Sequence, residues 1–481
     1  MSFTINAKHY EYESWSNNAR KCRAFMGGEA VVKAAGEEFL PRLTGQPKKE
    51  YESYLYRALF YGAARRTRSA LSGGIHRRPP VVDIPSSYQN FLDDITLQET
   101  PFNLLAKQVT DEVLTTGKIG VCIDFDDLSG RPYCRTYTGE SIINIRTANH
   151  YGQQVLVMCV LEEFRDEEHD DDPFTIERRK YFRVKLLDNG VYKEQIWKTT
   201  DKKETKFALV EEYTPTRNGA TLDFIPVVII NTSQIGPHIF EESMLSDLVS
   251  VNIQHFITSA DMGMIMHLSG LPTLVLTGID SGSLDDDTPI RLGSTTSIIL
   301  PPGADAKIVE FSGASAGSVR QFLIDLESRM AVLGARLLDP TAVSAATATT
   351  EIVKTAAEQT SLGSLTQTLD IGLSKILNIM MWWAGNETAQ AKVSLNKDFL
   401  SSKLSPSQLT SLVDAFIKGG LSAEVFLHQL EQGEMLPPQF DKDAEAKRLT
   451  SLPDDKEGMN MRTERDQGPD TTIQARPNNA V

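Results

Sequence analysis

Apolar residues recur three and four positions apart in two long stretches of the second half of the chain. In the first stretch, 313–338, these positions are Val319, Leu323, Leu326, Met330, Leu333 and Leu337. The spacing predicts a helix whose coiled-coil-like stripe needs a neighbour to bury it. In the second, a helix predicted from Glu351 to about Gly385, one face carries Leu365, Leu369, Leu373, Ile376 and Met380. Between them lies a hinge made mostly of Ala, Ser and Thr. Because no catalytic motif lies nearby, the pattern favours a mechanical component of an assembly over an enzyme.

A third long helix is predicted over 241–268, and Gly270-Leu271-Pro272 ends it. Residues 271–312 then change to a small β insertion, with strand-like runs at 273–277, 297–300 and 307–311. Because this insertion lies between two long helices, its ends must lie close together. The pattern therefore predicts a small β module held on a stalk of two helices.

The N-terminal part of the chain predicts helices followed by a sheet. Its first 150 residues give helices over 51–71 and 91–114, an extended segment at 81–82 and a buried strand over 119–125. Residues 151–232 change to short alternating or apolar runs, and Asn189-Gly190 between two of them is a strong hairpin signal. We therefore expect an antiparallel sheet that ends with the apolar run 225–230.

Beyond Gly385 the pattern predicts a short strand over 393–399 and a helical pair over 406–417 and 423–432. After Pro438 the chain is polar and rich in Asp, Arg, Gln, Pro and Asn, which predicts a charged helical turn followed by disorder.

The net charge of −15 argues against a general nucleic-acid coat, because wrapping phosphates requires clustered Lys and Arg. The negative charge is compatible with a protein past which DNA slides without binding tightly. The four cysteines are too few and too scattered for a disulfide framework or a zinc site. The N-terminus lacks a signal-peptide pattern, and the most apolar long stretch, 244–276, contains Asp, Asn, Gln and His, so we predict no membrane span.

The sequence lacks a Gly-rich dinucleotide loop, a nucleophile elbow and a paired-His motif, so no cofactor, metal or enzyme activity is predicted. Three acidic clusters were weighed against that prediction. Asp124, Asp126 and Asp127 end a predicted strand, where a metal-dependent nuclease would place carboxylates, although a solvated turn is favoured. Segment 162–172 has eight acidic residues in eleven and predicts an exposed loop between strands. Asp285-Asp286-Asp287 lies in the β module, which favours a docking role.

Basic residues concentrate in one place, between Arg57 and Arg78. The candidate site residues there are Arg57, Arg65, Arg66, Arg77 and Arg78. They could pair with acidic elements of the same chain, contact DNA phosphates, or contact an acidic surface of an adjacent subunit. We favour the subunit contact.

A set of short segments is distinctive in its order along the chain: 54–61, 65–67, 74–80, 131–133, 137, 142–146, 242–245, 252–255, 259–261, 270–273 and 395–399. In that order they resemble the portal-protein family of tailed bacteriophages, of the short-tailed phage type. The similarity covers roughly residues 45–435, and Ile145 stands where Trp is expected.

The resemblance implies an α+β portal fold with a wing, a helical stem, a small β clip, a long kinked wing helix with a tunnel loop, and a helical crown. The implied parts are wing 1–235, stem helix 236–270, clip 271–312, second stem helix 313–338, tunnel loop 339–350, long wing helix and return strand 351–400, crown 401–438 and polar tail 439–481.

It also implies a homo-oligomeric ring of twelve subunits at one capsid vertex of the virion, assembled in the host cytoplasm. Double-stranded DNA would pass through its channel during packaging and ejection, and the implied protein partners are the terminase large subunit, a tail adaptor and the major capsid protein. Asp285, Asp286 and Asp287 would serve clip docking. The implied tunnel-loop residues are Thr341, Ala342, Val343, Ser344, Ala345, Ala346 and Thr347.

Two other readings stay open. One is a metal-dependent enzyme that uses Asp124, Asp126 and Asp127. The other is a filament or scaffold protein built from the same long helices.

Overall fold

The computed structural model places the chain in two units, Met1–Phe399 and Leu400–Val481, each described here by itself. It describes residues 4–150, 152–169, 172–201, 204–237, 240–270, 273–278, 302–309, 315–338, 348–386, 390–397, 406–418 and 420–432, with a few further positions between 388 and 448. Both helices and sheets are present, as the predicted α+β class requires. Within the described residues no helix is long and apolar enough to cross a membrane.

The first hundred residues form short helices around the central core. Their bounds are α1 Tyr12–Gly27, α2 Glu29–Ala35, α3 Lys48–Arg57, α4 Ala63–Ile75, α5 Asn90–Asp93 and α6 Phe102–Thr116. The prediction of one helix over 51–71 is wrong, because the chain breaks between α3 and α4. The prediction over 91–114 is also wrong in its first half: Leu97 and Glu99 take positive φ, and Pro101 starts α6.

The end of α6 is fixed by Gly117, as predicted. This residue has φ 87°, and its backbone N–H donates to the carbonyl of Val113. A Cβ at Gly117 would lie 2.3 Å from the carbonyl oxygen of Glu241, so the segment that leads to the next long helix crosses directly over this turn. A side chain at position 117 would therefore clash as well as strain the backbone.

A three-stranded antiparallel sheet follows, in the order β11-β2-β3. Its strands are β2 Lys118–Asp126, β3 Arg131–Thr138 and β11 Val227–Asn231. The apolar run 225–230 was expected to end the larger sheet, but Val227–Asn231 pairs with β2 instead. All five residues of β11 are buried, so this run serves the central core rather than a half-exposed sheet.

The larger sheet has five antiparallel strands in sequence order. They are β4 Ile142–His150, β5 Gln153–His169, β6 Asp172–Asp188, β7 Val191–Thr199 and β8 Phe207–Tyr213. The predicted turn at Asn189-Gly190 is confirmed, with φ of 52° and 80°. The exposed loop predicted over 162–172 is wrong, because most of this acidic segment is strand. Basic residues opposite explain the difference: Glu162 pairs with Lys180 and Glu163 with Arg183.

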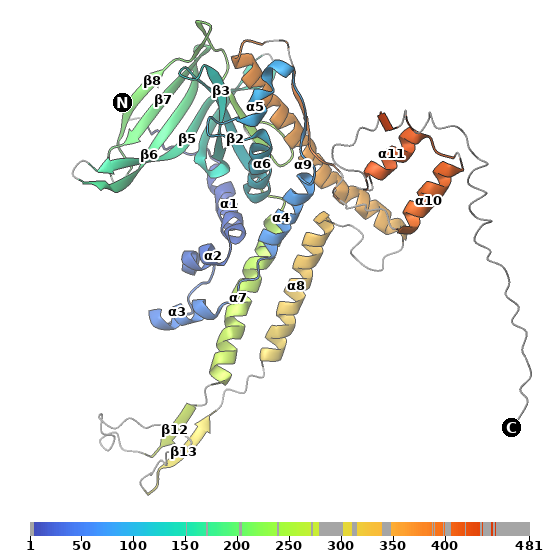
Figure 1. The fold of residues 1–481 in the computed structure, drawn as a ribbon. Helices are drawn as coiled ribbons and strands as arrows, with labels where there is room; N and C mark the ends of the chain where they lie inside the picture. Colours follow the sequence, from blue (N-terminus) through green and yellow to red (C-terminus); the bar gives the residue numbers. More distant parts are fainter. Residues whose placement is uncertain are drawn as a thin grey trace, which may run out of the picture. The chain divides into compact units, whose positions relative to one another are not determined.

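Two long helices, α7 Ser246–Ser269 and α8 Ala316–Leu338, lie side by side (Figure 1). Between them come β12 Thr273–Thr277 and β13 Asp305–Val309, which pair antiparallel with Thr273 opposite Val309. The predicted strand 273–277 is present, the strand predicted over 307–311 is found as 305–309, and 297–300 and 310–311 lie outside the described residues. The third long helix, α9 Ala348–Trp383, contacts the three-stranded sheet.

The predicted stripe on α9 is confirmed, because all five of its residues are buried in the central core. That core joins α4, α6, α7 and α9 to the three-stranded sheet. A second apolar cluster forms where α1 covers the five-stranded sheet. The predicted strand over 393–399 is shorter than expected: β14 Lys392–Ser394 pairs with β1 Val81–Asp83.

The second unit contains the predicted helical pair, α10 Pro406–Ile417 and α11 Ala423–Gln432. Phe416 and Phe426 stack between the two helices, with ring centroids 4.3 Å apart.

Candidate functional site

The pair formed by α7 and α8 is the structural centre of the candidate site. Leu326 and Met330 of the predicted α8 stripe are buried, whereas Phe322 and Ile324 on the same helix remain 42% and 43% exposed. Near the C-terminal end of α8, a Cβ at Gly334 would lie 2.8 Å from Thr67 Oγ1. The helix therefore packs closely on α4 there, while it keeps apolar side chains exposed elsewhere.

A buried histidine links the two helices. His255 of α7 lies 3.3 Å from Glu327 Oε1 of α8, and its side chain is only 6% exposed. Its ring also lies against Tyr61, with centroids 5.3 Å apart.

Polar side chains of α7 hold the break between α3 and α4. The Ser259 hydroxyl donates to the carbonyl of Leu59 (2.8 Å) and accepts from its backbone N–H (3.1 Å). The fully buried Asn252 amide donates to the carbonyl of Tyr61 (2.7 Å) and accepts from the N–H of Ala64 (3.3 Å). These bonds replace those that a continuous helix would make, which is why the break is stable.

A third contact joins α3 to α7. The Tyr54 hydroxyl donates to Asp261 Oδ1 at 2.6 Å, and a Cβ at Gly263 would lie 3.2 Å from the Arg57 Cβ. Burial and this hydrogen bond raise the pKa of Tyr54. The α3–α4 segment is therefore fixed to α7, and α7 thereby determines the position of Arg57, Arg65 and Arg66.

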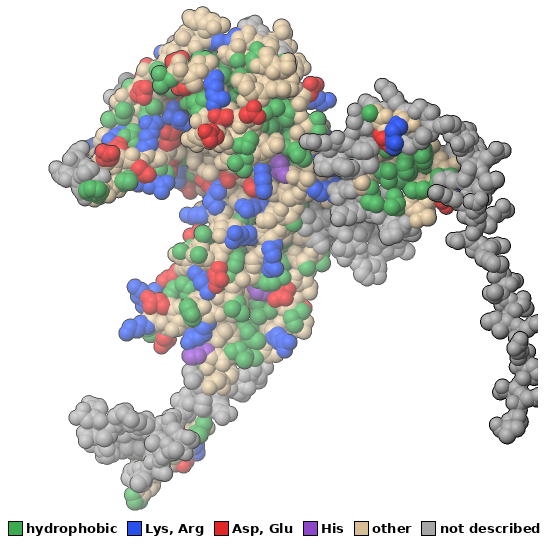
Figure 2. All heavy atoms as spheres, in the orientation of Figure 1, with side chains coloured by type: hydrophobic (Ala, Val, Ile, Leu, Met, Phe, Trp, Pro, Cys, Tyr) green, Lys and Arg blue, Asp and Glu red, His purple; other side chains and the backbone are tan. Residues whose placement is uncertain are grey.

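The five candidate arginines fall into two groups. Arg65 and Arg66 are exposed on α4, and Arg57 is half-buried at the end of α3. Arg66 stacks over Tyr61 at 4.8 Å, and within the described part of the chain none of these three forms an ion pair with a carboxylate. Arg77 and Arg78 lie beyond α4, are half-buried and have interaction partners. Basic side chains gather over α4 in Figure 2.

The other candidate site residues lie outside the described residues. They are the clip residues Asp285, Asp286 and Asp287 and the tunnel-loop residues Thr341, Ala342, Val343, Ser344, Ala345, Ala346 and Thr347. Their roles therefore stay predictions. In the sequence, β12 precedes and β13 follows Asp285-Asp286-Asp287. These two strands pair as a hairpin in which Ile308 and Val309 are exposed.

The three aspartates that a metal-dependent enzyme would use do not converge on one point. Asp124 is 3.0 Å from the amine of Lys185, and Asp126 accepts a hydrogen bond from the backbone N–H of Ser129 in the following turn. Among the described residues no group of three or more His, Cys, Asp and Glu could hold a metal ion. The arrangement corresponds to the favoured interpretation, a strand that runs into a turn.

A buried ionic cluster, formed by Arg183, Lys185 and Glu194, was missed by the sequence reasoning. Lys185 and Glu194 are fully buried, with Nζ and Oε2 2.6 Å apart, and Arg183 donates to the same carboxylate. Although burial alone would raise it, the charges of Lys185 and Arg183 lower the pKa of Glu194 to about 2. The spacing of Arg183 and Lys185, two positions apart among apolar residues of β6, is the signal that could have revealed the cluster.

Lys118 at the start of β2 is a second buried charge. Its amine lies 3.6 Å from the ring centroid of Phe240, and burial lowers its pKa to about 7. Trp15 covers the same place, and its indole N–H donates to the carbonyl of Glu241 at 2.8 Å. This lysine is a packed element of the core beside α1.

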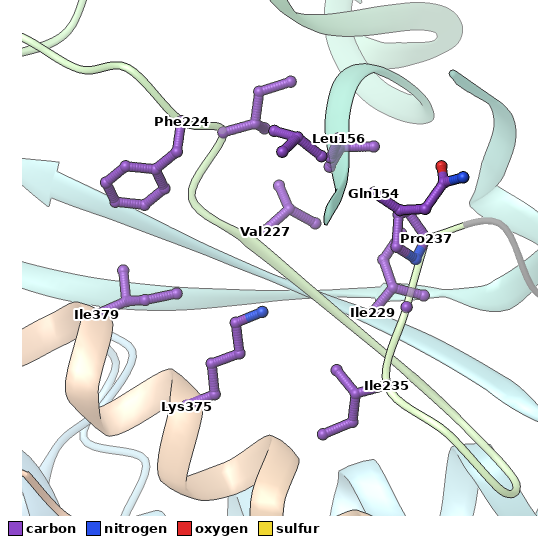
Figure 3. A pocket seen from close by; sticks show the side chains of 12 residues that line it. Gln154, Leu156, Phe224, Val227, Ile229, Ile235, Pro237, Lys375 and Ile379 are labelled. Carbon is purple, nitrogen blue, oxygen red and sulfur yellow. The ribbon is translucent and has the colours of Figure 1, made fainter. Parts of the chain in front are cut away.

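A pocket of about 430 Å³ lies between β5, β11 and α9 (Figure 3). Its walls are mainly apolar, and Lys375 of α9 extends into it. Among the described lining residues there is no His, Cys, Asp or Glu, and Lys375 is the one ionisable side chain.

Comparison with known proteins gives matches of two kinds. A family model described as a domain of unknown function (DUF4055) matches residues 244–384, the segment that contains α7, both strands of the β hairpin, α8 and α9. No curated protein matches the chain.

The second kind is similarity to solved structures. A chain of the virion of a native gene transfer agent particle is 12% identical, with 86% of this chain and 100% of that chain covered and a TM-score of 0.38. A chain of the neck of that particle, computed with C12 symmetry, is 12% identical, with 88% and 98% covered and a TM-score of 0.31. An HK97 family phage portal protein from Corynebacterium diphtheriae is 13% identical, with 73% and 94% covered and a TM-score of 0.29. The chain is thus similar to a phage portal protein and to chains of gene transfer agent particles.

Proposed function

We propose that this chain is the subunit of a portal ring, the channel through which double-stranded DNA enters and leaves the capsid of a tailed bacteriophage. The observation that carries the proposal is the α7–α8 pair with a β hairpin at its end. A pair of this kind, followed by the long α9, has the order of stem, clip, stem, tunnel loop and wing helix. The sequence segments that resemble the portal family support the same assignment.

The proposed ring needs heterologous contacts, in which two different faces of each subunit meet. Phe322 and Ile324 are exposed apolar residues two positions apart on α8, so they lie on different sides of this helix. Both sides belong to the α7–α8 pair. We assign them to contacts between neighbouring stems.

The channel is assigned to the segment between α8 and α9. A lining of Ala, Ser and Thr at 341–347 would offer DNA few charged groups, and a subunit with a net charge of −15 would repel phosphates. Low friction follows, because each phosphate held tightly would slow the passage of DNA. We assign docking of the terminase large subunit, and later of a tail adaptor, to the β module with Asp285, Asp286 and Asp287, and assign the wing to contact with the major capsid protein.

The deciding experiment is mass measurement of the purified assembly together with negative-stain imaging. The proposal expects closed rings with a central hole and a mass equal to a whole number of subunits, near twelve. Monomers at high protein concentration would contradict it, and open filaments would favour the scaffold hypothesis. An activity that requires Asp124, Asp126 and Asp127 would favour the enzyme hypothesis.

A further inference from the structure

The hairpin of β5 and β6 extends beyond the rest of its sheet (Figure 1). β4 pairs with β5 as far as Leu161, and β7 pairs with β6 from Tyr181 onward. The remaining segments, 162–169 and 172–180, pair with each other and with no further strand among the described residues. We call this two-stranded part the arm. Eight residues of strand span about 26 Å.

One face of the arm combines exposed apolar and acidic side chains. The register places Phe164 opposite Lys180, Asp166 opposite Arg178 and Glu168 opposite Ile176, so these six residues share a face. The charged groups of Arg178 and Lys180 lie 4.8 and 5.6 Å from the centroid of the Phe164 ring. Phe164 is 51% exposed and Ile176 is 64% exposed. Asp166 and Glu168 are exposed, and neither forms an ion pair within the described part of the chain. Over 162–180 the sequence has nine acidic and four basic residues.

An arm of this kind gains stability from a partner. Two strands alone are marginally stable in water, and here their large apolar side chains face solvent. The partner should offer apolar side chains beside unpaired positive charge. A surface of the same chain has this chemistry, and it is far from the arm in sequence.

That surface, which we call the arginine face, consists of Tyr56, Arg57, Leu59, Arg65 and Arg66. Tyr56 and Leu59 are 84% and 72% exposed. Residues 54–80 include six arginines and no Asp or Glu. Hydrogen bonds from Ser259 and Asn252 hold this surface rigidly on α7, so it is prepared for binding.

We infer that the arm of one copy docks on the arginine face of a second copy, with Phe164 and Ile176 against Tyr56 and Leu59 and with Asp166 and Glu168 against Arg65 and Arg66. The inference rests on the proposed ring, because a contact between two different faces of identical chains propagates around a closed ring. The arm then provides a second belt of contacts, separate from the stems.

The test uses the full chain and a bifunctional maleimide. The native thiols Cys22, Cys122, Cys134 and Cys159 are all buried, so introduced cysteines dominate the reaction. Ile176→Cys combined with Leu59→Cys should give covalent dimers and higher ladders on a denaturing gel. The matched control combines Ile176→Cys with Leu128→Cys, since Leu128 is 98% exposed but lies outside the arginine face. Equal cross-linking of the two pairs overturns the inference.

Charge exchange adds a second measurement on surface positions that do not affect folding. When Asp166→Arg and Glu168→Arg are added to the variant with Ile176→Cys and Leu59→Cys, the yield of cross-linked dimer should fall at least fivefold. Adding Arg65→Glu with Arg66→Glu should restore it. If instead Arg65→Glu with Arg66→Glu leaves cross-linking unchanged and abolishes retention of duplex DNA, the arginines serve DNA and the inference is wrong.

Imaging separates this inference from the proposed function. Wild-type rings without specific cross-linking would reject the arm contact and leave the portal proposal intact. Specific cross-linking in a protein that forms no ring would reject the portal proposal and leave the arm contact intact.

Discussion

At the scale of single residues, the buried ionic cluster is the most demanding feature of the molecule. Lys185 and Glu194 have no exposed side-chain surface, and each charge is compensated by the other. Burial alone would lower the pKa of Lys185, but Asp124, Tyr192 and Glu194 raise it well above its usual value. Removal of Glu194 would take one counter-charge from each of two buried cations and leave Lys185 with Asp124 and Arg183 with Glu163.

The variant Glu194→Gln should therefore lower the free energy of unfolding by about 3–5 kcal/mol. Glu212→Gln is the matched control, because Glu212 lies on the neighbouring strand and is exposed. It should change stability by less than about 0.5 kcal/mol. Urea denaturation of both variants measures the difference, and equal midpoints would contradict the account of the cluster.

Acid should act on the same cluster. Burial would raise the pKa of Glu163, but its hydrogen bonds with Arg183 and Tyr137 lower that pKa to about 2, and the pKa of Glu194 is also about 2. A carboxyl whose pKa is lowered by folding stabilises the protein above its ordinary pKa, and this contribution is lost as pH falls through the folded value. We expect the urea midpoint to fall steadily from pH 4.5 towards pH 2. A midpoint that stays constant down to pH 2.5 would be inconsistent with these pKa values.

At the scale of elements, the packing of α9 on the three-stranded sheet depends on a helix glycine. A Cβ at Gly372 would lie 2.5 Å from Ile230 Cδ1 and 2.8 Å from its Cγ1, and Ile230 is fully buried on β11. Gly363 lies earlier on the same helix, and a Cβ built there would have no heavy atom within 4 Å. The two glycines thus differ in environment but share one helix.

We expect Gly372→Ala to destabilise the protein by about 1–3 kcal/mol, because overpacking must move Ile230 or α9. Gly363→Ala should stabilise it by up to about 1 kcal/mol, because alanine favours a helix. Thermal unfolding of the two variants gives the comparison. Stabilisation by both substitutions would show that α9 does not pack tightly on β11.

The elements that the sequence predicted well are those with a long periodic pattern. α7, α8, α9 and the final helical pair follow apolar repeats that need one buried face, and the Asn189-Gly190 turn has its own local chemistry. The break between α3 and α4 could not be foreseen, because the side chains that stabilise it, Asn252 and Ser259, come almost two hundred residues later. The acidic strand 162–169 was missed for another reason: its basic partners on β6, Lys180 and Arg183, come soon after it in the sequence but face it only when the two strands pair.

The candidate site was predicted less completely than the fold. The arginines were found from composition, but their division into exposed Arg65 and Arg66 and half-buried Arg77 and Arg78 depends on tertiary packing. The arm could not be predicted either, since its length beyond the sheet follows from where β4 and β7 stop pairing.

At the scale of the whole molecule, assembly should depend on the exposed apolar residues of α8. Phe322→Asp combined with Ile324→Asp places charge on two sides of α8 that we assign to neighbouring stems. We expect the mass of the assembly to shift to monomers or small oligomers while the thermal unfolding temperature stays nearly constant. Leu128→Asp is the control and should leave assembly unchanged, because Leu128 lies on the turn after β2. Intact rings formed by the double variant would show that these residues of α8 do not belong to the interface between subunits.

The close crossing at Gly117 has a mechanical consequence. The segment that enters α7 touches the turn between α6 and β2 through main-chain atoms, with Glu241 against the glycine, and the indole of Trp15 holds the same carbonyl. Because main-chain atoms are in contact here, the two segments have no room to move towards each other. A pull or push along α7 is therefore transmitted directly to the central core and to the sheet that begins at β2.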